Sequence, residues 1–173
     1  MKRLLVVVDY QKDFIDGALG FKGAELIAPR IVELIKEFEA NNDDVVFTLD
    51  THFDDYLETV EGKNLPIKHC LKNTKGWGFA DEIDALTKGH SVFEKQGFGS
   101  DALGEYVKQN QYDEIYLCGL VSDICVFSNA IIVKAFSSPI TKIKVVQNAT
   151  SSGDLLMEEK SFEMLKHLHI EII

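Results

Sequence analysis

Short apolar runs alternate along the chain with longer segments of helical spacing, and this alternation limits the possible folds more than any other feature. The first run, residues 3–8 (RLLVVV), is apolar throughout, which is typical of a strand buried on both faces. Similar runs predict strands at residues 44–49, 90–93, 114–118, 142–147 and 169–173, and the segments between them predict helices at residues 24–40, 77–86, 100–109, 122–136 and 155–168. The alternation predicts an α/β protein with three layers, α-β-α, around a mostly parallel, Rossmann-like central sheet.

Length and charge restrict the possible partners. A chain of 173 residues fits one domain, residues 1–173, with a sizeable core. The formal net charge of −10 argues against nucleic acid or an anionic membrane surface as a partner. The apolar run near the N-terminus is too short for a membrane span, and the three cysteines include no C-x-x-C pair. A cytoplasmic protein without a disulfide framework is the expectation.

Polar residues follow four of the predicted strands, where parallel sheets bind their ligands. These residues are Asp9, Asp50 with His52, Lys95, and the turn that contains Cys125. Carboxylate, imidazole, amine and thiol groups are therefore expected to converge on one edge of the sheet.

Cys125 is a candidate nucleophile because of its expected position in the first turn of the helix over residues 122–136. Free backbone N–H groups and the positive end of the helix dipole lower a thiol pKa there, as does a nearby lysine. Lys95 could supply that positive charge, and Asp9 could take the thiol proton and pass it to a leaving amine. The same N–H groups could hold an oxyanion.

Each residue also has a purely structural interpretation. A lone buried cysteine is often core filler, Lys95 could be a solvated charge, and Asp9 could cap a turn. Cys118, within an apolar strand, is expected in the core, and Cys70 is expected to have a surface or packing role.

Three motifs carry a resemblance to a known family. Asp9 stands in VVVDYQKDF, Lys95 in VFEKQGFGS and Cys125 in CGLVSDICV. This pattern resembles the catalytic triad of the isochorismatase-like cysteine hydrolases, which include the nicotinamidases, and the resemblance runs from about residue 2 to residue 148. It implies a cis peptide between Val121 and Ser122 that turns backbone N–H groups, including that of Cys125, toward the oxyanion.

The long segment over residues 50–74 is a candidate metal site. Asp50 and His52 are two residues apart after a strand, so their side chains face the same way, and His69 lies near the end of the segment. One carboxylate and two imidazoles suit Zn(II), Fe(II) or Mn(II). The family resemblance implies the same three ligands and a glutamate from the intervening loop, for which Glu58 is the first choice and Glu61 the second.

The resemblance also implies a substrate and a reaction. Phe14 and Trp77 match positions where nicotinamidases have aromatic contacts, and Phe98 is near Lys95, so these three are expected to bind substrate; core packing is the alternative for Phe14. The implied activity is metal-assisted hydrolysis of nicotinamide or pyrazinamide to the acid and ammonia through a cysteine thioester. The rivals are a related cysteine hydrolase acting on another amide or carbamoyl compound, and a metal-binding domain without catalysis. Relatives are often oligomers, so a homo-oligomer is expected.

Overall fold

A computed structural model describes residues 1–173 and contains one six-stranded sheet in which every neighbouring pair of strands is parallel. The strands are β1 (Arg3–Val8), β2 (Asp44–Asp50), β3 (Ser91–Lys95), β4 (Glu114–Leu120), β5 (Lys142–Ser151) and β6 (Glu171–Ile172). Their order is β3-β2-β1-β4-β5-β6, so the direction of winding reverses between β1 and β4. Ligands of such sheets bind beyond the carboxyl ends of the strands at this reversal.

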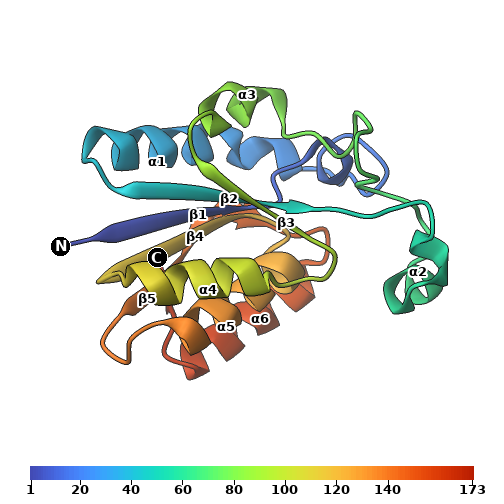
Figure 1. Ribbon diagram of the computed structural model, residues 1–173. Coiled ribbons are helices and arrows are strands. Elements are labelled where there is room, and N and C mark those ends of the chain that lie inside the picture. Colours follow the sequence, from blue (N-terminus) through green and yellow to red (C-terminus); the bar gives the residue numbers. More distant parts are fainter.

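Helices cover both faces of the sheet, as the alternating pattern predicts (Figure 1). The helices are α1 (Ala28–Ala40), α2 (Val60–Asn64), α3 (Asp81–Asp84), α4 (Asp101–Asn110), α5 (Phe127–Phe136) and α6 (Leu155–His167). Helices α1 and α3 lie on one face and α4, α5 and α6 on the other, while α2 stands apart beyond one end of the sheet. None of the helices combines the length with the apolar composition that a membrane span requires.

Side chains of the central strands alternate between two cores. In β1, Leu5 and Val7 face the core under α1, whereas Leu4, Val6 and Val8 face the core under α4, α5 and α6. All five are fully buried, which explains why this strand reads as one continuous apolar run. The predicted three-layer fold is confirmed.

Several predicted boundaries differ from the structure. The predicted helix over residues 77–86 begins only at Asp81, because the preceding backbone pairs with the segment after β1: the N–H groups of Lys12 and Ala80 donate to the carbonyl oxygens of Gly78 and Tyr10, both at 3.0 Å. The helix predicted over residues 24–40 starts as a 3-10 turn at Ala24–Ile27. The predicted loop over residues 50–74 contains α2 and a 3-10 turn at Tyr56–Glu58.

Candidate active site and metal centre

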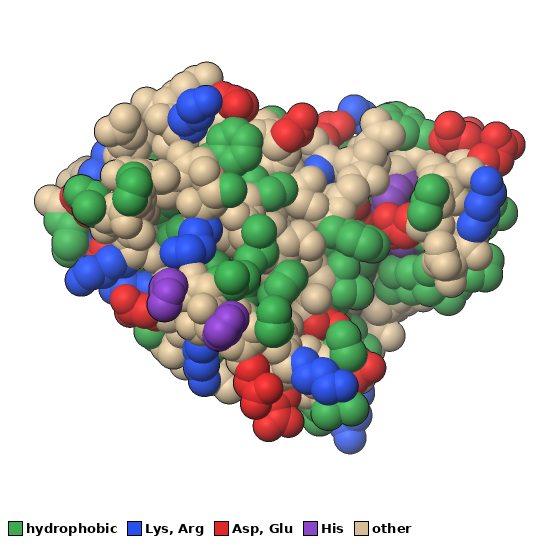
Figure 2. Space-filling model, turned by 90° about the horizontal axis from the view of Figure 1, so that it is seen from below, with side chains coloured by type: hydrophobic (Ala, Val, Ile, Leu, Met, Phe, Trp, Pro, Cys, Tyr) green, Lys and Arg blue, Asp and Glu red, His purple; other side chains and the backbone are tan.

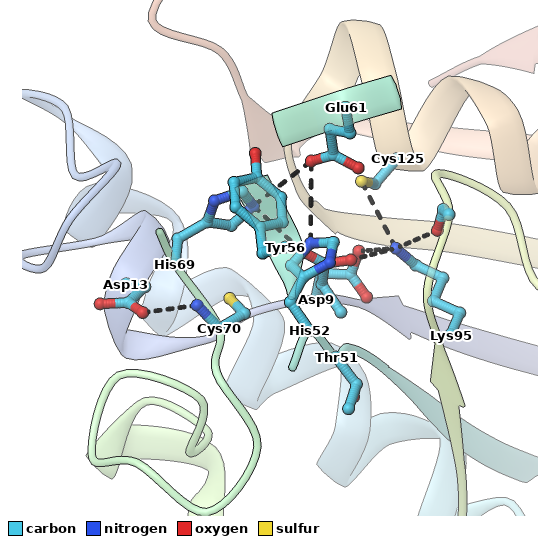
Figure 3. A network of polar contacts seen from close by, with 12 residues as sticks. Asp9, Asp13, Thr51, His52, Tyr56, Glu61, His69, Cys70, Lys95 and Cys125 are labelled. Atoms are coloured by element: carbon cyan, nitrogen blue, oxygen red, sulfur yellow. Dashed lines mark hydrogen bonds and ion pairs between the residues drawn. The ribbon is translucent and has the colours of Figure 1, made fainter. Parts of the chain in front are cut away.

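Four neighbouring strands bring the predicted polar residues to the carboxyl edge of the sheet. Asp9 follows β1, Asp50 and Lys95 end β2 and β3, and Cys125 lies in the turn after β4. The side chains of Asp9, Lys95 and Cys125 point toward one another, with Glu61 above them (Figure 3). Segments far apart in the sequence thus meet where the parallel arrangement predicts.

Lys95 lies at the centre of this group. Its Nζ is 2.6 Å from Asp9 Oδ2, 3.4 Å from Asp50 Oδ1 and 3.6 Å from Cys125 Sγ, and it donates a hydrogen bond of 3.0 Å to the carbonyl oxygen of Gly97. The side chain is buried, so Lys95 is not a solvated surface charge. An ammonium held between two carboxylates and a thiol is enclosed in a low-dielectric site, where its charge acts strongly on each neighbour.

Asp9 is fully buried and firmly held. The hydroxyl of Thr48 donates a 2.6 Å hydrogen bond to Asp9 Oδ1, and Oδ2 faces Lys95. Its backbone has φ of 44°, in the left-handed region that non-glycine residues seldom adopt outside functional sites. Burial raises the pKa of the Asp9 carboxyl above its ordinary value, although Lys95 opposes the change. A carboxylate with a raised pKa is a better proton acceptor.

Cys125 is buried and lies in a wide turn rather than in regular α-helix. Ser122–Val126 form one π-helical turn, closed by a 3.1 Å hydrogen bond from the N–H of Val126 to the carbonyl oxygen of Val121, and α5 follows directly. Burial raises the pKa of the Cys125 thiol well above its ordinary value, and only Lys95 opposes this effect while Asp9 and Asp50 add to it. The expectation of a net lowered thiol pKa is therefore wrong for the resting protein, since burial outweighs the lysine. Forming the thiolate requires a base close at hand.

The cis peptide lies one residue earlier than predicted. It joins Leu120 to Val121, not Val121 to Ser122. Strand β4 runs to Leu120, and the chain turns directly after the last residue of the strand. Ser122 is buried, and its hydroxyl donates a 2.6 Å hydrogen bond to Glu158 of α6, which ties this turn to the helix beneath it.

Asp50, His52 and His69 form a compact cluster of potential metal ligands. One ligand atom from each residue lies within 4.8 Å of the others, and all three residues are buried. Asp50 Oδ2 is 2.9 Å from His52 Nε2 and 3.4 Å from His69 Nε2. The Nδ1–H of His69 donates to the carbonyl oxygen of Ile67 at 2.8 Å, which leaves Nε2 directed into the cluster.

Glu61 of α2, not Glu58, is the carboxylate that completes this cluster. Glu61 Oε1 lies 3.7 Å from His52 Nε2 and 3.5 Å from His69 Nε2. Figure 3 shows Glu61 facing the two histidine rings. Glu58 is exposed in the preceding 3-10 turn and forms no ion pair with His52 or His69, whereas Glu61 follows three residues later in α2. The first choice from the sequence is therefore wrong and the second is the residue in place.

The donor set fits a divalent cation. Two imidazole nitrogens and two carboxylates suit Zn(II), Fe(II) or Mn(II), and two clustered carboxylates favour a bound positive charge. Burial opposes protonation of His69, but hydrogen bonding to Asp50 and Glu61 raises its pKa to about 10. In the metal-free protein His69 therefore carries a proton at neutral pH. The hydrogen bonds from His52 and His69 lower the pKa of Asp50 despite its burial.

Two of the three predicted aromatic contacts line a small hollow between the cysteine and the metal cluster. This inner hollow has a volume of about 110 Å³, and its wall includes Phe14, Phe98, His69 and Cys125. Phe14 is mostly buried and Phe98 is 47% exposed at the mouth. An aromatic ring that enters this hollow meets aromatic and apolar side chains on its way to the thiol.

The third predicted aromatic contact, Trp77, does not line the inner hollow. Its ring packs against the core under α1, and its Nε1–H donates a 2.9 Å hydrogen bond to Thr51 Oγ1. The glycines on either side of Trp77 serve the backbone pairing with the segment after β1 instead of exposing the ring to substrate. The prediction of a substrate contact is therefore corrected to a packing role behind β2.

Gln11 is a supporting residue that the sequence reasoning did not assign. It is fully buried, accepts a 2.8 Å hydrogen bond from the N–H of Asp50, and donates hydrogen bonds to the carbonyl oxygens of Asp50 at 2.9 Å and Trp77 at 2.8 Å. It thereby clamps the backbone of a metal-cluster residue. Its place two residues after Asp9, in a quoted motif, is the signal that could have found it.

Asn129 gives similar support to the cysteine turn, again without a role assigned from the sequence. Its side-chain amide donates to the carbonyl oxygens of Cys125 at 2.8 Å and Phe98 at 3.1 Å. Cys118 is fully buried in the core, as expected, and Cys70 is also fully buried, which fits its expected packing role. No disulfide forms.

The comparisons place the chain in a family. The family model for the isochorismatase domain matches residues 3–173, so the chain belongs to the isochorismatase family. Its curated relatives include the isochorismatase family protein PncA of Bacillus subtilis (strain 168), which is 32% identical over 76% of this chain and 78% of the relative. The nicotinamidase/pyrazinamidase of Mycobacterium tuberculosis is 29% identical over 74% of this chain and 76% of the relative.

Solved structures agree with this assignment. The crystal structure of nicotinamidase PncA from Bacillus subtilis superimposes with a TM-score of 0.86, is 28% identical, and is covered over 99% of both chains. The similarity thus extends over the whole fold and includes all four strand ends that build the site.

Proposed function

We propose that this protein is a metal-assisted amidase that hydrolyses nicotinamide to nicotinate and ammonia through a thioester on Cys125. The observation that carries the proposal is that Lys95 contacts both Asp9 and Cys125, while Cys125 lines a hollow whose wall also includes Asp50 and His69 of the metal cluster. The names of the relatives, nicotinamidase and pyrazinamidase, support this choice of substrate. Pyrazinamide would react by the same chemistry.

In the first half of the reaction, Asp9 takes the proton of the Cys125 thiol. The Sγ atom attacks the amide carbon, and the carbonyl π electrons move to oxygen, where the backbone N–H groups of the turn, including that of Cys125, stabilise the negative charge. Asp9 returns the proton to the amide nitrogen, the C–N bond breaks and ammonia leaves. Lys95 stabilises the thiolate and the carboxylate in turn, because it touches both.

In the second half, Asp9 acts again as a base. It takes a proton from water, whose oxygen attacks the thioester carbon. The C–S bond then breaks to release the acid, and Asp9 returns the proton to Sγ, which restores the thiol of Cys125. The full burial of Asp9 and its hydrogen bond from Thr48 keep the carboxylate in one position for both steps.

Asp50, His52, His69 and Glu61 would hold the divalent metal, Zn, Fe or Mn. A bound ion of this kind supplies a Lewis acid that can accept a lone pair from a pyridine or pyrazine nitrogen and so orient the ring. Phe14 and Phe98 would enclose that ring from the wall of the inner hollow.

Ammonia release from nicotinamide tests the proposal. Metal-loaded wild-type protein is expected to release ammonia, and Cys125→Ala protein is expected to release none. Cys118→Ala is the matched control, because Cys118 is a buried cysteine of the core outside the site, and it should stay active. The proposal fails if the wild-type protein is inactive on nicotinamide and pyrazinamide. Activity on carbamoyl compounds alone would favour the related hydrolase, and metal binding without any turnover would favour a non-catalytic domain.

We further propose a single domain, a cytoplasmic location and a homo-oligomer. The single sheet supports one domain, and the three free cysteines support a cytoplasmic location. Helix α6 supports a homo-oligomer, because it exposes three large apolar side chains: Leu155 is 72% exposed, Leu156 59% and Met164 52%. Sedimentation of the purified protein as a monomer at micromolar concentration would refute the oligomer.

A further inference from the structure

A second, larger hollow opens directly outside the inner hollow. This outer hollow has a volume of about 620 Å³ and lies between α2 and the segment after β3. Glu61, Leu65, Phe98 and Ile124 belong to the walls of both hollows, so the two are adjacent. The outer hollow is therefore the next space that a substituent meets when it projects outward from a ring seated over Cys125.

The wall of the outer hollow is formed by hydrophobic side chains that are unusually exposed. Val60 is 79% exposed, Phe98 47%, Leu65 is half-buried and Ile124 is 39% exposed. Figure 2 shows hydrophobic side chains gathered around histidine side chains at the end of the molecule that carries α2. Apolar side chains that gather around the mouth of a polar site mark a surface that binds an apolar group.

The side chains that line the outer hollow disfavour a negatively charged substituent. No lysine or arginine lines the outer hollow, and its one charged side chain, Glu61, belongs to the metal cluster. The polar residues at the rim, Thr59, Asn64 and Gln96, are neutral. A phosphate or carboxylate substituent would find no cation to pair with, whereas an alkyl or aryl group would find four apolar side chains.

We infer that the outer hollow is a subsite for a neutral, apolar substituent on the ring of the substrate. The inference rests on the proposed amidase function and extends its substrate class from nicotinamide to ring-substituted aromatic amides. Leu65, Phe98 and Ile124 contact the substituent where it leaves the inner hollow, and Val60 contacts its far end.

Binding to Cys125→Ala protein loaded with zinc tests the subsite separately from turnover. The probes are nicotinamide and its 5-alkyl and 6-alkyl derivatives, from methyl to butyl, measured by isothermal titration calorimetry. Burial of each methylene is expected to tighten Kd roughly threefold to fourfold in at least one of the two series. A carboxybutyl derivative, which has the same reach but a negative charge, is expected to lose this gain.

Val60→Asp tests the location of the subsite. Val60 is exposed at the start of α2, where an aspartate is compatible with a helix, and the gain per methylene should fall below about twofold in this variant. Ile140→Asp is the matched control. Ile140 is 85% exposed and precedes β5, at the amino ends of the strands and away from the site, so the gain per methylene should persist. Alkyl derivatives that all bind no tighter than nicotinamide, or a gain that Val60→Asp leaves intact, would overturn the inference. Failure of the proposed function would appear instead as absent ammonia release by the wild-type protein.

Discussion

Replacing Lys95 by Met should slow the reaction of Cys125 with iodoacetamide, and the structure sets the size of the effect. Lys95 Nζ lies 3.6 Å from Cys125 Sγ. At an effective dielectric constant of about 20, unit charges at this distance attract by roughly 4–5 kcal/mol, which corresponds to a change of about 3 in the thiol pKa. A higher thiol pKa leaves less thiolate to react, which slows alkylation. A less acidic thiol is also a stronger nucleophile once ionised, and this offsets a little under half of the decrease in the logarithm of the rate. The alkylation rate should therefore fall roughly fiftyfold.

The assay is the rate of iodoacetamide labelling at one pH, with Cys125 identified by peptide mass. Lys72→Met is the matched control, because Lys72 pairs with Glu94 at 2.6 Å on the surface and removing it should leave the labelling rate unchanged. Removing Lys95 also leaves Asp9 as a buried, unpaired charge, so the thermal midpoint should fall, and the double variant Asp9→Asn/Lys95→Met should recover part of that fall. A labelling rate within about twofold of wild type, in a folded Lys95→Met protein, would refute the electrostatic role given to Lys95.

Three further changes have defined outcomes. Asp9→Asn should lower kcat for nicotinamide by roughly 10²–10⁴-fold while zinc binding stays near normal, and unchanged kcat would remove Asp9 from proton transfer. Glu61→Gln should weaken zinc binding at least about tenfold in a competition titration, whereas Glu58→Gln should not; equal effects would contradict the assignment of Glu61. The pKa of His69 is raised to about 10 in the metal-free protein, so below this pH zinc must displace a proton from His69 in order to bind. The apparent Kd for zinc should therefore fall by about tenfold per pH unit as the pH rises toward 10. A pH-independent Kd would show that no proton is displaced.

The sequence predicts the elements whose signal is local and repeated. The six strands and most helices follow from their apolar spacing, and the convergence of Asp9, Asp50, Lys95 and Cys125 follows from parallel topology alone. These features need no knowledge of side-chain packing, because the carboxyl ends of parallel strands share one edge.

The parts that the sequence does not predict depend on long-range geometry. Glu58 and Glu61 lie in the same loop, and only the start of α2 decides that Glu61 reaches the cluster. Trp77 has flanking glycines that suggest a pocket, but pairing of this backbone with the segment after β1 turns it toward the core. The thiol pKa of Cys125 is a balance between burial and charge that spacing alone cannot give.

The proposed mechanism requires a covalent acyl intermediate on Cys125, and peptide mass spectrometry after an acid quench can detect it. Metal-loaded protein is mixed with excess nicotinamide, quenched with acid during turnover and digested. A mass increase equal to one pyridine acyl group is expected on the peptide that contains Cys125, and none in Cys125→Ala protein. Continued ammonia release by the Cys125→Ala protein, or an acyl group on a different residue, would contradict it.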